Sequence, residues 1–326
     1  MKTMSKLKYH YGVKLRFYPS DQQKQLIKVN SDTSRFIYNE MVAINKELYQ
    51  LKRVKLPIDI VIDRIKQLEL RKNAKQLSNH FVFLYDQRID SLTKANAIQN
   101  YGKAWQAYRQ VHQAGVPKFH RKSYAWKYQT NCQYPKQNHA WLTNGTVRFI
   151  DKKHLTIPKL GKVRVSGSIK RLLSREAETR IGTVTISKDS ADRFFVSLQL
   201  ASDTPFVAPT KATQGNVGID LNIENYLTTS TGEVVPNPRF YQRITGRLAK
   251  EQRKLSRRAR RAKQEKRPLR ISKNYQKQRL LVAKLHAKVM DQRQNFLHLL
   301  STTLIKNHDL VVAEELRSKN LLKTET

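Results

Sequence analysis

Apolar and polar positions divide the first 115 residues into one strand followed by helices. Residues 9–18 alternate between apolar and polar side chains, which is typical of a β-strand. Ser20 or Asp21 then stands where a helix cap is expected, and apolar residues continue at helical spacing to about residue 50. The spacing predicts another helix over residues 84–110, with a polar, Lys-rich helical stretch between the two.

The pattern changes after Gly115-Val116-Pro117. Short runs of strand-like residues are separated by turn-forming residues such as Asn144-Gly145. These runs cover residues 146–150, 155–157, 162–165, 181–187 and 193–200. We predict a small antiparallel barrel that also contains the strand at 9–18, with the helices inserted between its first and second strands.

The last third of the chain begins after a linker at 203–215. A strand at 216–221 and a hairpin around Thr231-Gly232 precede a basic region. A long helix at about 273–307 and a strand at 310–314 complete the pattern. The predicted fold class is therefore α+β, with more than one domain.

The charge of the chain points to a polyanionic partner. The 326 residues include 63 Lys and Arg and 25 Asp and Glu, a net charge of +38. Such an imbalance repels itself unless a polyanion neutralises it, which favours a nucleic acid bound with strongly salt-dependent affinity. A membrane surface is the alternative, but the charge is spread along the chain rather than confined to one amphipathic helix.

The region from Lys250 to Arg279 concentrates this charge. It contains fourteen Lys and Arg residues and only Glu251 and Glu265 as acids, a local charge of +12. A charge run is often a solvated face, but this one lies between two predicted core strands, which favours contact with phosphates. The candidate phosphate contacts are Arg253, Lys254, Arg257, Arg258, Arg260 and Arg261.

Residues 117–128 interleave aromatic side chains with cations. Aromatic rings stack on unpaired bases while cations hold the backbone, so this pattern is typical of a nucleic-acid contact. A strand with buried aromatics and exposed lysines explains it equally well. The candidate contacts are Arg121, Lys122, Tyr124, Trp126 and Lys127.

Two carboxylates follow apolar strands, Asp220 after residues 217–219 and Glu314 after residues 310–313. Phosphodiester cleavage with two metal ions needs several carboxylates held close together, and adjacent strands can supply them. Either residue alone is more simply read as an ordinary strand end. The single cysteine, Cys132, excludes an internal disulfide and a CxxC zinc site within these residues.

Short sequence pieces occur in a fixed order along almost the whole chain. The pieces are residues 14–19, 34–39, 116–119, 157–163, 218–221, 252–258, 293–298 and 311–316. Each piece is weak alone, but in this order they resemble the TnpB family, the RNA-guided nucleases of IS200/IS605-type transposons and relatives of type V CRISPR effectors.

The resemblance implies an architecture and a set of partners. It implies a wedge-type β-barrel from residues 1–19 and 116–204, a helical recognition domain at 20–115 and a RuvC-type nuclease domain at 205–326. It also implies a guide RNA and a short adjacent motif read on double-stranded DNA. Ser91, Thr93 and Asn96, taken as exposed polar residues of the helix at 84–110, are the candidate motif readers.

The chain departs from the family pattern after Glu314, where a zinc ribbon and a third acidic residue are expected. We therefore expect a nuclease-dead, TnpB-like transcriptional repressor that requires no cofactor, with Asp220 and Glu314 as the remnant of an incompletely occupied metal site. The alternative is a partial chain of an Mg²⁺-dependent endonuclease. A guide-free DNA-binding protein explains the charge but not the ordered motifs. With no signal peptide and no apolar run of 18 residues, we expect the protein in the cytoplasm, near the nucleoid.

Overall fold

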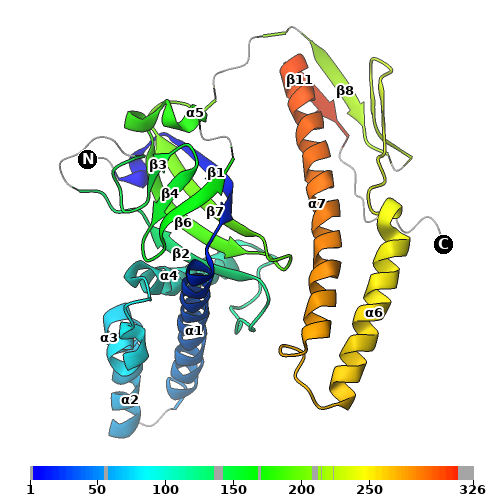
Figure 1. The fold of residues 1–326 in the computed structure, drawn as a ribbon. Helices are drawn as coiled ribbons and strands as arrows, with labels where there is room; N and C mark the ends of the chain where they lie inside the picture. The colour runs from blue at the N-terminus through cyan, green and yellow to red at the C-terminus, as the bar shows by residue number, and fades with distance from the viewer. Residues whose placement is uncertain are drawn as a thin grey trace. The chain divides into compact units, whose positions relative to one another are not determined.

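The computed structural model divides the chain into two compact units, unit 1 (Met1–Phe206) and unit 2 (Val207–Thr326) (Figure 1). The division falls beside the predicted start of the last domain at residue 205. The structure describes residues 3–54, 58–135, 142–167, 170–207, 212–213, 215–222 and 224–314. Part of the predicted linker at 203–215 and the end of the sequence piece at 311–316 lie outside these residues.

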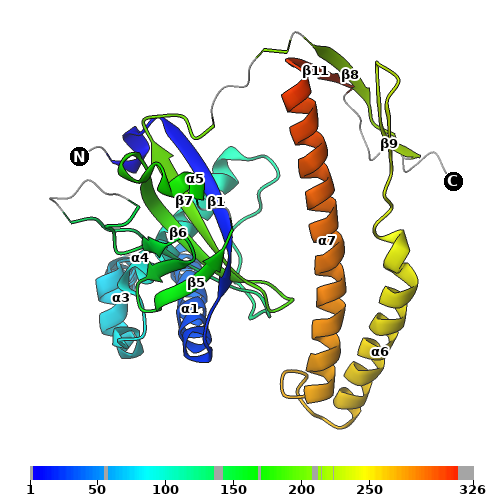
Figure 2. The ribbon, with the colours of Figure 1, turned by 45° about the horizontal axis from the view of Figure 1, so that its top comes forward.

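Unit 1 is built on a seven-stranded antiparallel sheet with the order β2-β6-β7-β1-β5-β4-β3 (Figure 2). The strands are β1 (Tyr9–Tyr18), β2 (Trp126–Asn131), β3 (Arg148–Asp151), β4 (His154–Ile157), β5 (Gly161–Ser166), β6 (Arg180–Lys188) and β7 (Phe194–Ser202). The prediction that the opening strand joins the later ones is confirmed, because β1 lies between β7 and β5. The edge strands are β2 and β3. Thr146, which precedes β3, donates its N–H to the carbonyl of Gln133, which follows β2, at 2.9 Å, so the chain segments next to the two edges are hydrogen-bonded.

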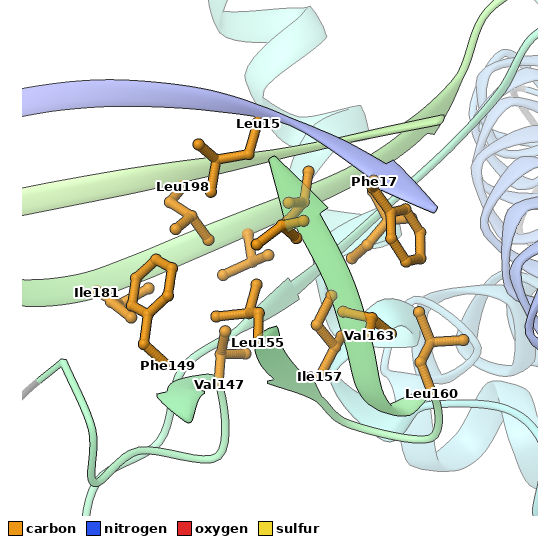
Figure 3. Packing of buried hydrophobic residues seen from close by; sticks show 14 of the residues in the cluster. Leu15, Phe17, Val147, Phe149, Leu155, Ile157, Leu160, Val163, Ile181 and Leu198 are labelled. Atoms are coloured by element: carbon orange, nitrogen blue, oxygen red, sulfur yellow. The ribbon is translucent and has the colours of Figure 1, made fainter. Parts of the chain in front are cut away.

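The concave side of this sheet holds the largest hydrophobic core (Figure 3). Leu15 and Phe17 point inward from β1 because alternate residues of a strand face the same side. Phe17 meets Phe194 edge to face, with ring centroids 6.1 Å apart. The alternation read from the sequence therefore corresponds to a real inner and outer face.

Helices separate β1 from β2 in the chain, as predicted. They are α1 (Asp21–Leu51), α2 (Asp59–Leu70), α3 (Ala74–His80) and α4 (Ser91–Gln110), with a 3-10 turn at Val82–Tyr85 before α4. Another 3-10 turn, Met4–Lys6, precedes β1. Ser20 caps α1 in a capping box, since its side chain accepts from Gln23 N while Gln23 Oε1 accepts from Ser20 N. The helix predicted from residue 84 starts later, because the Asp90 side chain caps it by accepting from Leu92 N at 3.0 Å.

Unit 1 also contains a short helix, α5 (Lys170–Leu173), and a 3-10 turn at Glu176–Glu178 that the sequence pattern did not predict. Within the residues described, no helix of either unit combines the length and apolar character needed to cross a membrane.

Unit 2 combines a four-stranded sheet, ordered β10-β9-β8-β11, with two helices (Figure 1). Its elements are β8 (Asn216–Asp220), β9 (Asn225–Thr229), β10 (Val234–Pro236), a 3-10 turn at Gln242–Ile244, α6 (Thr245–Gln264), α7 (Lys273–Asn307) and β11 (Leu310–Ala313). The two helices pack through a small cluster formed by Leu248, Val282 and Leu285. The long helix predicted at 273–307 is confirmed at both ends.

Candidate carboxylate site and nucleic-acid interface

The two predicted carboxylates meet at one end of the unit 2 sheet. β8 and β11 are parallel neighbours, with Val312 beside Gly218 and Ala313 beside Ile219. One further step along both strands places Glu314 beside Asp220, and adjacent strands are about 4.8 Å apart. Both side chains are exposed and line one shallow hollow, together with residues of β9.

The hollow offers oxygen donors suited to a hard cation. Mg²⁺ in proteins is commonly held by one or two carboxylates together with waters and substrate phosphate oxygens, so Asp220 and Glu314 fit one such ion. A two-metal phosphodiester site needs more carboxylates than this pair. Among the residues that the structure describes, no group of three or more His, Cys, Asp or Glu side chains is placed to hold a metal.

Helix α6 carries an exposed row of arginines. Arg253, Arg257 and Arg260 follow one another at intervals of four and three residues, so they lie on one helix face. All three are exposed, and none has a hydrogen-bond or ion-pair partner among the described residues. This face is therefore available to phosphates.

The other predicted phosphate contacts of α6 have partners within unit 2. Arg258 donates to the Asn274 carbonyl of α7 at 2.7 Å, and Arg261 pairs with Glu265 at 3.1 Å. Lys254 pairs with Glu251, which also accepts a hydrogen bond from Gln278 of α7 at 2.6 Å. The hydrogen bonds from Gln278 and Lys254 lower the pKa of Glu251, so this carboxylate is ionised at neutral pH.

Replacing Arg253, Arg257 or Arg260 by Ala should weaken binding to every DNA sequence by the same factor. Each loss of one phosphate contact is expected to reduce the slope of log K against log salt by about 0.9. Fluorescence anisotropy from 50 to 300 mM salt, on two unrelated duplexes, measures this slope. Gln264→Ala, a neutral exposed change on the same helix, is the control, and a loss that depended on DNA sequence would contradict the assignment.

The aromatic and basic segment 117–128 is part strand and part irregular chain. Trp126 starts β2, where the Lys188 ammonium lies 3.9 Å from its ring centroid and Phe194 packs against its edge. Tyr128 is 2 % exposed. Tyr128 is thus a buried aromatic of a strand, whereas Trp126 is half-buried and has one ring face covered by the Lys188 ammonium.

The cations of this segment line a basic pocket in unit 1 between α1, α4 and residues 120–129. Arg121, Lys122 and Lys127 are exposed at its wall, and Asp32 is a carboxylate of the lining. Tyr124 is half-buried next to this lining. The structure therefore brings the predicted cations of the segment together.

The same pocket contains residues that the search for basic patches missed. The Tyr38 and His120 rings are stacked with centroids 3.9 Å apart, and Arg35 lies beside them. Asn39 fixes the backbone of His120 by donating to its carbonyl at 3.0 Å and accepting from its N–H at 2.7 Å. Burial, and then the charge of Arg35, lower the pKa of His120 and favour its neutral form. The sequence could have pointed to Arg35, Tyr38 and Asn39, because all three fall in the sequence piece at 34–39 that resembles the family.

Two of the three candidate motif readers are not where they were expected. Thr93 is 0 % and Asn96 is 5 % exposed, so the prediction that they are exposed is wrong. Asn96 donates to the Leu92 carbonyl at 2.9 Å and to the Gln129 carbonyl of β2 at 3.4 Å, which joins α4 to the sheet. A buried amide that holds two elements together cannot reach a base edge, whereas Ser91 is exposed at the start of α4.

Comparison with protein families gives two matches. The model of the OrfB_IS605 family, described as a probable transposase, matches residues 195–325. A model of the same group described as a helix-turn-helix domain matches residues 4–53. In the structure this stretch contains β1 followed by the single 31-residue helix α1.

Comparison with individual proteins extends the similarity along the chain. A Streptomyces pristinaespiralis protein named "Putative RNA-guided DNA endonuclease" is 32 % identical over 313 residues, which cover 95 % of this chain and 68 % of that protein. InsQ of Escherichia coli K12, which carries the same description, is 23 % identical over 313 residues, covering 95 % and 67 %.

Among solved structures, a Cas12f1 chain in a complex with single guide RNA and target DNA is 11 % identical. The match covers 95 % of this chain and 82 % of that chain, with a TM-score of 0.37.

Proposed function

Because the chain belongs to the TnpB family, we propose that it is an RNA-guided protein that binds double-stranded DNA of matching sequence. The observation that carries the proposal is the 32 % identity, over 95 % of the chain, to a relative named for RNA-guided action on DNA. The net charge of +38 has the sign that contact with phosphate backbones requires.

The RNA and the protein have different roles in guided binding. In guided systems base pairing reads the target sequence, while the protein holds backbones and reads a short adjacent motif. The exposed Arg253, Arg257 and Arg260 are suited to the first protein task because arginine binds phosphate oxygens at fixed geometry. Of the three candidates for the second task, Ser91 remains.

The proposed domain roles follow the resemblance. We assign the sheet of unit 1 to a wedge-type barrel, helices α1 to α4 to a recognition domain, and unit 2 to a RuvC-type domain. The strand order of unit 2, β10-β9-β8-β11, supports the last assignment. In this sheet β8, β9 and β10 are antiparallel neighbours, and β11 runs parallel to β8.

For catalysis we propose binding without cleavage, with repression when the complex lies across a promoter. The hollow described here provides two carboxylates, enough for one Mg²⁺ with substrate phosphate but not for a two-metal clamp. DNA cleavage is the second candidate, favoured by the side-by-side placement of Asp220 and Glu314 and by the names of the relatives. When Mg²⁺ is bound, it would supply Lewis-acid stabilisation of a phosphate oxygen.

Sequencing the RNA that copurifies with the chain tests the proposed function. A gently purified sample should contain one dominant small RNA with a variable 3′ end, because a guided protein retains its own guide. Ribosomal and transfer RNA in proportion to their cellular abundance would instead indicate a guide-free basic protein.

A further inference from the structure

A second hollow of unit 2, which we call the aromatic pocket, is lined by rings from three separate segments. Tyr226 comes from β9, Phe240 and Tyr241 from the segment between β10 and α6, and Phe296 from α7. Phe296 meets Tyr226 and Phe240 edge to face, with centroids 5.0 and 6.1 Å away. Tyr226, Phe240 and Phe296 are each half-buried, so ring surface remains exposed to the pocket.

The aromatic pocket is apolar inside and cationic at its wall. Arg239 and Arg293 are exposed lining residues, and the described lining contains no carboxylate. Arg239 has a positive φ of 46°, and its N–H donates to the Asn237 side chain at 3.1 Å, which fixes the turn that carries it. The aromatic rings suit a flat, apolar group. The two arginines, with no acid beside them in the described lining, suit a negative charge attached to that group.

The aromatic pocket lies next to the carboxylate site. Thr228 of β9 is the register partner of Asp220, and both line the carboxylate hollow. Tyr226 is two residues from Thr228, so strand alternation directs both side chains to one face, with about 7 Å between their Cα atoms. A nucleic-acid strand lying along β9 would therefore contact both places.

We propose that the aromatic pocket binds an unpaired nucleobase of a strand whose backbone passes Asp220 and Glu314. The base stacks on the exposed ring surface, and Arg239 and Arg293 contact the flanking phosphates. This inference rests on the proposed function, because that function brings an unpaired strand to the protein. It assigns a recognition role to Tyr226, Phe240 and Phe296, which lie outside the basic region singled out from the sequence.

The test compares two fluorescein-labelled single strands of equal length, oligothymidine and a strand of abasic sites. They carry the same phosphates and differ only in bases. Stacking on an aromatic platform is expected to make the full chain bind oligothymidine about tenfold more tightly in an anisotropy titration. Phe240→Leu, which keeps an apolar side chain but removes the ring, should abolish most of this preference and leave the affinity for the abasic strand unchanged.

Two controls separate the inference from the proposed function. Tyr49→Leu removes an exposed ring on α1 and should retain the full base preference. Arg257→Ala should weaken both strands equally. Equal affinities of the wild-type chain for the two strands, or a base preference that Phe240→Leu leaves intact, would refute base binding in the aromatic pocket and leave guided DNA binding in place. Failure of the wild-type chain to bind either strand would refute both.

Photocrosslinking gives a readout that does not depend on a variant. A 5-iodouracil-substituted strand bound to the wild-type chain should crosslink to peptides containing Tyr226, Phe240, Tyr241 or Phe296. Crosslinks confined to other peptides would mean that the pocket holds a protein side chain or remains unused by the strand, and would refute the inference.

Discussion

The chain stripped of its RNA is expected to lose its preference for one duplex sequence by at least about a thousandfold, the usual margin between specific and non-specific DNA binding. The reason is that the exposed arginines of α6 are expected to contact phosphates, which are the same in every sequence. Nuclease treatment, repurification and competition binding with matched and unmatched duplexes measure the change. Returning the RNA should restore the preference.

The control for this experiment is the affinity for unmatched DNA. It should stay high and salt-dependent after RNA removal, because the charge that drives it belongs to the protein. A stripped chain that kept its full sequence preference would instead read base edges itself, and the guided account would then be wrong.

Matched duplex is expected to remain uncut when the complex is incubated with Mg²⁺ or Mn²⁺. In the proposed account Asp220 and Glu314 hold one ion, so the attacking water and the leaving oxygen are not both held by metal. Without metal, Asp220→Ala should bind matched DNA at least as tightly as the parent chain, because removing a carboxylate removes repulsion of phosphate. Denaturing electrophoresis of the samples with metal and a binding titration without metal measure the two results.

A promoter reporter extends this experiment to cells. Asp220→Ala should repress as fully as the parent chain, since occupancy alone blocks transcription in this account. The combined change of Arg253, Arg257 and Arg260 to Ala should relieve repression. Metal-dependent cuts that vanish in Asp220→Ala would establish an endonuclease and contradict the proposed loss of cleavage.

The elements that local sequence determines were predictable. The alternation of residues 9–18 predicted β1, and the turn at Ser20 predicted the start of α1, because both signals act within a few residues. The start of α4 was missed by seven residues, since Asp90 caps the helix and Val82–Tyr85 forms its own turn. Element types were therefore better predicted than their boundaries.

Features that depend on distant contacts were predicted only where a family pattern or a repeated motif joined them. Asp220 and Glu314 are 94 residues apart, and two strands each ending in a carboxylate supplied the link. Asn96 is polar and lies on a helix, so it was read as exposed, but its partner is a carbonyl of β2 that helix periodicity does not reveal. The aromatic pocket combines Tyr226, Phe240 and Phe296 from three segments, and no sequence spacing connects them.

Exchange of the guide is the most direct test of RNA-guided binding. The variable 3′ segment of the copurified RNA is replaced by a new sequence, the RNA is assembled with the stripped chain, and the old and new matched duplexes compete in one binding reaction. The account predicts that the preference moves to the new duplex. A preference that stays with the old duplex, or equal binding of the two duplexes, would contradict it.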